Sequence, residues 1–124
     1  MSGSGEIPPQ VQNLLAQLQQ LKVQLEALGR QKMQVEALLR DAEHALEELE
    51  KVGENPVIYK NVGELMIKAG KETVKEELAE RKETYDLRLK TLERQEERAQ
   101  KRYQQLQEQL REALGAVTPQ PMGA

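Results

Sequence analysis

One stretch, Val57-Ile-Tyr-Lys-Asn-Val-Gly-Glu-Leu-Met-Ile-Lys68, differs in kind from the sequence on either side of it. Two short runs of β-branched and apolar residues flank Asn61-Val-Gly-Glu64, and Asn and Gly favour turns. The segment 53–72 is therefore predicted to contain a β-hairpin. Alternation along the strands predicts one wholly apolar face, made by Val57, Tyr59, Leu65 and Ile67, and a second face made by Ile58, Lys60, Met66 and Lys68.

A heptad repeat of apolar residues occupies the segments on both sides of the hairpin. Over residues 10–52 the two seam positions are apolar except at Lys32, and over residues 73–114 they are apolar except at Lys82 and Glu96. A repeat sustained for this long predicts two coiled-coil helices. The seam of the first is Val11, Leu14, Leu18, Leu21, Leu25, Leu28, Lys32, Val35, Leu39, Ala42, Leu46 and Leu49. The seam of the second is Leu78, Lys82, Tyr85, Leu89, Leu92, Glu96, Ala99, Tyr103, Leu106, Leu110 and Ala113.

Local signals predict where the second helix begins and ends. Thr73-Val-Lys-Glu76 has the form of a capping box, which satisfies free N–H groups at a helix start. Gly115 is predicted to be the C-cap, and Pro119 prevents the helix from resuming. The chain ends, residues 1–9 and 115–124, are predicted to be flexible tails.

The two helices are nearly equal in length, and the short insert between them lets the chain fold back. We therefore expect a mainly α fold, a long antiparallel two-helix coiled coil with a single β-hairpin at its apex. In the register that matches the two seams, Leu21 faces Leu106. The charged seam residues Lys32 and Glu96 then fall opposite each other, and a polar pair of this kind can fix the register.

The composition limits the classes of function. The 124 residues carry 18 Lys and Arg against 21 Asp and Glu, a net charge of −3, which argues against a nucleic-acid partner. Hydrophobic residues make up only 38%, and there is no Phe or Trp, so a compact globular core is not expected. The chain has no cysteine and no apolar run long enough to span a membrane. We expect a soluble cytoplasmic protein.

No group of residues predicts catalysis or a cofactor. His44 is the single histidine, and we interpret it as a solvated surface residue because a metal site needs ligands from further helices. The stretch Lys68-Ala-Gly-Lys-Glu-Thr73 departs from a phosphate-binding loop at two positions, Leu65 in place of the first Gly and Glu72 after the lysine. We therefore expect no catalytic residue, no metal and no cofactor.

The hairpin predicts an oligomer. A two-stranded hairpin is marginally stable in water and presents two open edges that invite pairing with another chain. We expect hairpins from several copies, or from related subunits, to join in a shared β-structure. The predicted assembly residues are Val57, Ile58, Tyr59, Val62, Leu65, Met66 and Ile67. The alternative is a hairpin that folds back onto its own coil.

The helix ends far from the hairpin carry no charge. Residues 7–21 and 113–124 lack Asp, Glu, Lys and Arg, whereas charged residues gather in the rest of the chain. Apolar residues beyond the seam, among them Leu15, Leu114 and Val117, indicate adhesive ends. The alternative is frayed helix ends with neutral tails.

Over residues 7–115 the chain resembles the beta-type subunits of prefoldins, particularly the archaeal ones. The resemblance rests on Asn55-Pro-Val-Ile-Tyr-Lys-Asn-Val-Gly-Glu-Leu-Met-Ile-Lys68, on Lys75-Glu-Glu-Leu78 and on Thr91-Leu-Glu-Arg-Gln-Glu-Glu97. Alpha-type subunits carry two hairpins and need a longer insert, so the short insert of this chain favours the beta type.

The resemblance implies an ATP-independent holding chaperone. It implies a hetero-hexamer of two alpha-type and four beta-type subunits, whose hairpins form a β-barrel platform. It also implies that the tips of the coiled coils bind unfolded polypeptide clients, prevent their aggregation and deliver them to a group II chaperonin. The client-binding residues would be Ile7, Val11, Leu14, Leu15, Leu18, Leu110, Leu114 and Val117. The alternative is a structural coiled-coil adaptor without client-holding activity.

Overall fold

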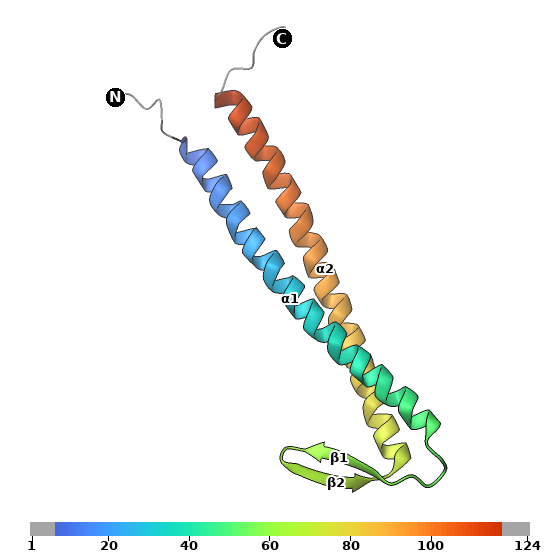
Figure 1. Cartoon of the computed structure of the whole chain (residues 1–124). Helices are drawn as coiled ribbons and strands as arrows, with labels where there is room; N and C mark the ends of the chain where they lie inside the picture. The colour runs from blue at the N-terminus through green and yellow to red at the C-terminus, as the bar shows by residue number, and fades with distance from the viewer. Residues whose placement is uncertain (1–6, 118–124) are drawn as a thin grey trace. The chain divides into compact units, whose positions relative to one another are not determined.

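The computed structural model describes residues 7–117, and the side chains of residues 7–115. It contains four elements in the order α1 (Pro9–Lys51), β1 (Ile58–Val62), β2 (Leu65–Ala69) and α2 (Lys71–Val117) (Figure 1). The predicted fold class, two long helices that pair antiparallel and a single β-hairpin between them, is confirmed. The chain divides into two compact units, which comprise residues 7–30 with 94–117 and residues 31–93 of the described part.

In the first unit the beginning of α1 and the end of α2 lie side by side and share one apolar core (Figure 1). Leu106 is its most buried side chain, with 1% of its surface exposed. Both Leu21 and Leu106, which were predicted to face each other, belong to this cluster. Its members are the buried Val11, Leu14, Leu18, Leu106 and Ala113 and the partly buried Leu21, Tyr103 and Leu110. All of them are predicted seam residues, so the heptad repeat builds this core.

In the second unit the end of α1 and the beginning of α2 also pair through seam residues. Val35, Ala42 and Leu49 of α1 and Leu92 of α2 are buried. Lys82, one of the charged seam residues, does not remain in the seam. Its ammonium lies 3.8 Å from a carboxylate oxygen of Glu43 on α1, because the long aliphatic stem of a lysine can cover apolar surface while its charge stays in water.

The hairpin has a tighter turn than the sequence predicted. Val62 pairs directly with Leu65, so only Gly63 and Glu64 form the turn, and Asn61 and Val62 continue the strand. Gly63 has a φ of +60°, a value that glycine adopts without the steric cost of a Cβ. A positive φ at the first turn residue is typical of the type II′ hairpin turn, whose twist matches that of the strands.

The predicted hairpin faces are wrong. Residues directly opposite each other in an antiparallel pair share a face, and a turn with an even number of residues places even-numbered residues of one strand opposite odd-numbered residues of the other. Tyr59 pairs with Lys68 and Lys60 pairs with Ile67. The first face is therefore Ile58, Lys60, Val62, Leu65, Ile67 and Ala69, and the second is Tyr59, Asn61, Met66 and Lys68. The first face is apolar except for Lys60.

The predicted beginning and the predicted end of α2 are also wrong. The helix begins at Lys71, and its first turn is closed by the bond from the Val74 amide to the Gly70 carbonyl at 3.1 Å, so Thr73 is not the N-cap. At the other end the helix runs through Gly115 to Val117. Glycine lowers helix stability without ending a helix, so Gly115 is not the C-cap.

Other sequence predictions remain untested. Both Lys32 and Glu96 are half-buried. Because Lys32 belongs to one unit and Glu96 to the other, their pairing stays a prediction. Most of the predicted tails, residues 1–6 and 118–124, lie outside the described residues.

Replacement of Gly29 by alanine is expected to stabilise the chain. Gly29 lies inside α1, and a Cβ built there would meet nothing within 4 Å. A helix with alanine at an interior position is more stable than one with glycine by about 1 kcal/mol. The free energy of unfolding, measured by chemical denaturation, should therefore rise by about that amount. Gly63→Ala is the matched control and should destabilise, because of its positive φ. A loss of stability in Gly29→Ala would contradict the uninterrupted helix.

Candidate functional site

The charge-free end of the first unit combines buried and exposed apolar side chains. Of the predicted client-binding residues, Val11, Leu14 and Leu18 are buried in the core between the helices, and Leu110 is half-buried. In contrast, Ile7 is 47%, Leu15 43% and Leu114 45% exposed. The side chain of Val117 lies outside the described ones. The structure thus divides the predicted set into a core and an accessible surface.

A shallow groove of about 480 Å³ lies on this part of the first unit. Its apolar lining comes from Leu18 of α1 and from Tyr103, Leu110 and Leu114 of α2, and Gln107 and Arg111 contribute polar groups. The charge of Arg111 is engaged by Glu108 at 2.9 Å. The groove therefore offers an apolar floor for an aliphatic or aromatic side chain. Sequence reasoning assigned Tyr103 only to the core, because a seam position gives no sign of lining a groove.

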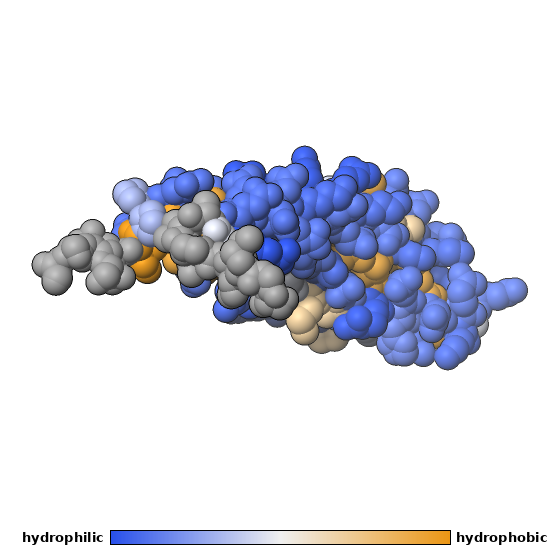
Figure 2. Space-filling view, turned by 90° about the horizontal axis from the view of Figure 1, so that it is seen from above, coloured by the Kyte–Doolittle hydropathy of each residue, from blue (hydrophilic) through white to orange (hydrophobic). Residues whose placement is uncertain are grey.

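Amide side chains surround this apolar surface. Gln12 donates from Nε2 to the carbonyl of Ile7 at 2.8 Å, just before α1 begins. Arg102 of α2 donates to the amide oxygen of Gln17 on α1 at 3.5 Å. Glutamine side chains can both donate and accept hydrogen bonds. Around the exposed apolar residues they provide polar contacts that carry no net charge (the space-filling view in Figure 2 shows apolar patches within a largely hydrophilic surface).

The hairpin is a second candidate site. Of the predicted assembly residues, Ile58 is half-buried, and the other six are exposed, Leu65 to 64%. Val57 precedes β1 and the remainder lie on the strands. The two strands pair only with each other, as Figure 1 shows, so each keeps one open edge within the described chain. The hairpin therefore does not bury its apolar residues against its own coil, contrary to the fold-back alternative.

Three polar contacts hold the hairpin and the neighbouring helix ends. Lys60 of β1 lies 2.8 Å from a carboxylate oxygen of Glu77 on α2. Lys71, the first residue of α2, donates to the carbonyl of Val52 at 3.5 Å. Lys75 of α2 lies 3.0 Å from Glu50 of α1.

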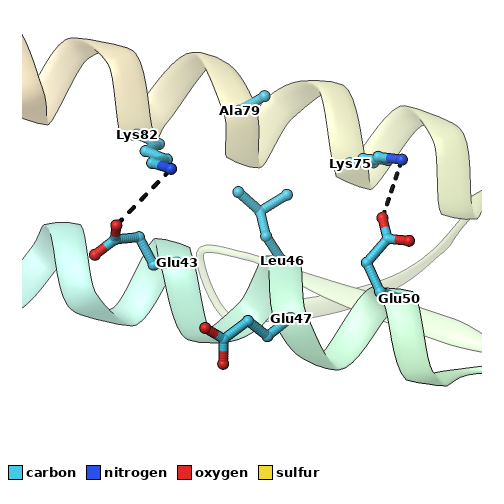
Figure 3. Close-up of a pocket in the computed structure, with 7 residues that line it drawn as sticks. All are labelled: Glu43, Leu46, Glu47, Glu50, Lys75, Ala79 and Lys82. Atoms are coloured by element: carbon cyan, nitrogen blue, oxygen red, sulfur yellow. Dashed lines mark ion pairs between the residues drawn. The ribbon is translucent and has the colours of Figure 1, made fainter.

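A groove beside the hairpin end of the coil is framed by two ion pairs between α1 and α2. Figure 3 shows Leu46 pointing from α1 toward α2, between Glu43–Lys82 and Glu50–Lys75. The hydrogen bond and the charge of Lys75 lower the pKa of the Glu50 carboxyl, and the same contacts raise the pKa of the Lys75 ammonium. The two ion pairs thus link α1 to α2 on either side of Leu46.

The Glu50–Lys75 pair is expected to make the stability of the second unit depend on pH. The pKa of Glu50 is lowered from 4.5, so its contribution is complete above that pH and is lost as the pH falls through the lowered pKa. The pKa of Lys75 is raised from 10.5, so its contribution is complete below that pH and is lost as the pH rises through the raised pKa. Glu50→Gln should abolish the fall in stability at acid pH. For an exposed ion pair this fall is about one or two degrees in melting temperature.

Circular dichroism melts between about pH 3 and pH 7 would measure this effect. Glu47→Gln is a matched control, because Glu47 lines the same groove (Figure 3) and makes no ion pair there within the described residues. An identical pH profile in the two variants would contradict the role of the pair.

The described residues contain no cluster of three or more His, Cys, Asp or Glu side chains that could hold a metal ion. His44 is exposed. In the same part of the chain, no helix combines the length and apolar character needed to cross a membrane.

Comparison with known proteins assigns the family. The sequence model of the prefoldin subunit family matches residues 12–116, which is most of the chain. The chain belongs to the prefoldin subunit family. It is 62% identical to the prefoldin subunit beta of Archaeoglobus fulgidus over 94 aligned residues. These aligned residues cover 76% of this chain and 81% of that one. It is 56% identical to the prefoldin subunit beta of Methanothrix thermoacetophila, with 94% of this chain and 98% of that one covered.

Solved prefoldin structures agree with the fold. The prefoldin beta subunit from Thermococcus strain KS-1 superposes with a TM-score of 0.82 at 37% identity, over 94% of this chain and 98% of that one. The prefoldin beta2 subunit from the same strain has a TM-score of 0.68 at 14% identity, which shows the fold alone. Prefoldin subunits are chaperones and not enzymes, and membership of the family supports a chaperone subunit that assembles with other prefoldin subunits.

Proposed function

We propose that this chain is the beta-type subunit of an ATP-independent holding chaperone that binds non-native polypeptides at the free ends of its coiled coils. The observation that carries the proposal is the charge-free end of the first unit. There Ile7, Leu15 and Leu114 are exposed, and Leu114 also lines an apolar groove. Exposed apolar groups near glutamine amides suit unfolded chains of many sequences, because apolar contacts need no complementary charge.

The proposed complex is a cytoplasmic hetero-hexamer with alpha-type subunits and further beta-type copies. The exposed apolar residues of the hairpin and the two open strand edges support assembly through this element. Its hairpins would form a β-barrel platform, which removes the open edges. Delivery of clients to a group II chaperonin is part of the proposal and rests on the resemblance to prefoldins.

Holding depends on many weak contacts made at once. Several coiled coils joined at one platform raise the effective concentration of binding ends around a client, so weak contacts add to a useful joint affinity. Weak individual contacts also permit release without nucleotide. Val11, Leu14 and Leu18 are buried, so they would reach a client only after the helix ends separate. The accessible contacts of the closed pair come from the exposed residues.

Light scattering of a denatured client diluted into nucleotide-free buffer tests the proposal. This chain would first be co-assembled with its alpha-type partner. Suppressed aggregation at near-equimolar complex, unchanged by ATP, would support a holding chaperone. Undiminished aggregation in the presence of a fully assembled complex would overturn it.

The second candidate is a structural coiled-coil adaptor that joins folded partners. One observation favours it: Met33 of α1 and Leu87 of α2 are 68% and 59% exposed, although neither belongs to the charge-free end or to the hairpin. Apolar residues of this kind could dock a folded protein. An adaptor would bind one folded partner with fixed stoichiometry and would leave client aggregation unchanged.

A further inference from the structure

The apolar first face of the hairpin contains one charged residue, and that residue contacts α2. Lys60 lies among Ile58, Val62, Leu65, Ile67 and Ala69 on this face. Its ammonium lies 2.8 Å from a carboxylate oxygen of Glu77, and the two side chains are 35% and 37% exposed. A charge on a face of this kind weakens apolar packing, so its presence calls for a separate reason.

Few side-chain contacts hold the direction of the hairpin. Gly70 alone joins β2 to α2, and within the described residues Lys60–Glu77 is the one hydrogen bond or ion pair between a strand and a helix. On the other side, residues 52–57 form no helix or strand and are mostly exposed. Only the base of the hairpin, at Ile58, Lys60 and Ala69, is half-buried. Besides the short junction at Gly70 and the packing at the base, few contacts therefore limit how the hairpin projects from α2.

We propose that Lys60 and Glu77 are a positioning pair, which fixes the direction of the hairpin relative to α2 and thereby aligns its open edges for pairing with other subunits. The inference rests on the proposed assembly through the hairpin. Strands pair only when their backbones meet in register at about 4.8 Å. A hairpin held in one direction loses less conformational freedom on assembly than a hairpin that must first be ordered.

The test measures assembly of the chain with an alpha-type partner, by native mass spectrometry over a range of concentrations. Lys60→Gln and Glu77→Gln each remove one charge and keep a polar side chain. Each is expected to weaken assembly about three- to fivefold, the range for a partly exposed ion pair. The exchanged pair, Lys60→Glu with Glu77→Lys, is expected to recover most of the loss. Glu76→Gln, the same change on the neighbouring exposed residue of α2, is the control and should have no effect.

Hydrogen exchange of the unassembled chain gives a second measurement. In Glu77→Gln the amides of residues 58–69 should exchange faster, and those of α1 should not change. Unchanged assembly in both single variants, or no recovery in the exchanged pair, would overturn the inference. Leu65→Asp separates this result from the proposed function. If Leu65→Asp blocks assembly while Lys60→Gln and Glu77→Gln leave it unchanged, only the positioning role fails. Normal assembly of Leu65→Asp means that the proposed hairpin assembly itself fails.

Discussion

Leu65→Asp is expected to prevent this chain from entering a complex with its partner subunits. Leu65 is 64% exposed and lies on the apolar face of the hairpin, directly opposite Val62. A carboxylate placed in an apolar interface without a partner costs several kcal/mol, so assembly should weaken about 100-fold or more. Because Leu65 is exposed in the single chain, the helices should fold as before. Size-exclusion chromatography with light scattering, together with circular dichroism, would measure both properties.

Leu87→Asp is the matched control for this experiment. Leu87 is the same residue type in the same unit, is 59% exposed, and lies on α2 outside the hairpin. Its substitution should leave assembly within about twofold of the unchanged chain, as for surface substitutions in general. Normal assembly by Leu65→Asp would contradict assembly through the hairpin.

Leu106→Ala is expected to destabilise the first unit by about 2–5 kcal/mol, the cost of removing a fully buried leucine side chain and leaving a cavity. Leu106 is 1% exposed and lies in the core cluster of this unit. Chemical denaturation followed by circular dichroism would give the free energy of unfolding. The loss should be large, because a two-helix unit has few other core residues to support it.

Leu15→Ala provides the contrast, since it makes the same chemical change at a residue that is 43% exposed. Its free energy of unfolding should change by no more than about 0.5 kcal/mol, while aggregation suppression by the assembled complex should fall. Equal destabilisation by the two variants would contradict the assignment of Leu106 to the core and of Leu15 to the surface.

The periodic part of the fold could be predicted from the sequence because helices transmit a repeat without interruption. The seam residues from Val11 to Ala113 form the observed cores, since the same spacing places them on one face of each helix. The hairpin was predicted in the right place but with the wrong faces. The prediction kept the odd-numbered residues of both strands on one face, but a turn with an even number of residues, here Gly63 and Glu64, places odd-numbered residues opposite even-numbered ones.

The candidate site was predicted less completely for a different reason. The sequence marked Val11, Leu14 and Leu18 as seam residues and also as client-binding residues, but a side chain buried between paired helices is not available to a client. Absence of charge marks the end of the coil that we propose to bind clients, without separating its core from its surface. The contact of Lys60 with Glu77 could not be predicted either, because it joins a strand to a helix and depends on the hairpin register.

The most direct test of client binding at the charge-free ends is site-specific photo-crosslinking of a denatured client to the assembled complex. A photoreactive residue would replace Leu15 or Leu114 in the first unit, or Leu87 in the second, three leucines that are 43%, 45% and 59% exposed. We expect strong crosslinks from Leu15 and Leu114 and few from Leu87, although Leu87 is the most exposed of the three. Crosslinks of equal strength from all three positions, or from Leu87 alone, would contradict client holding at the ends.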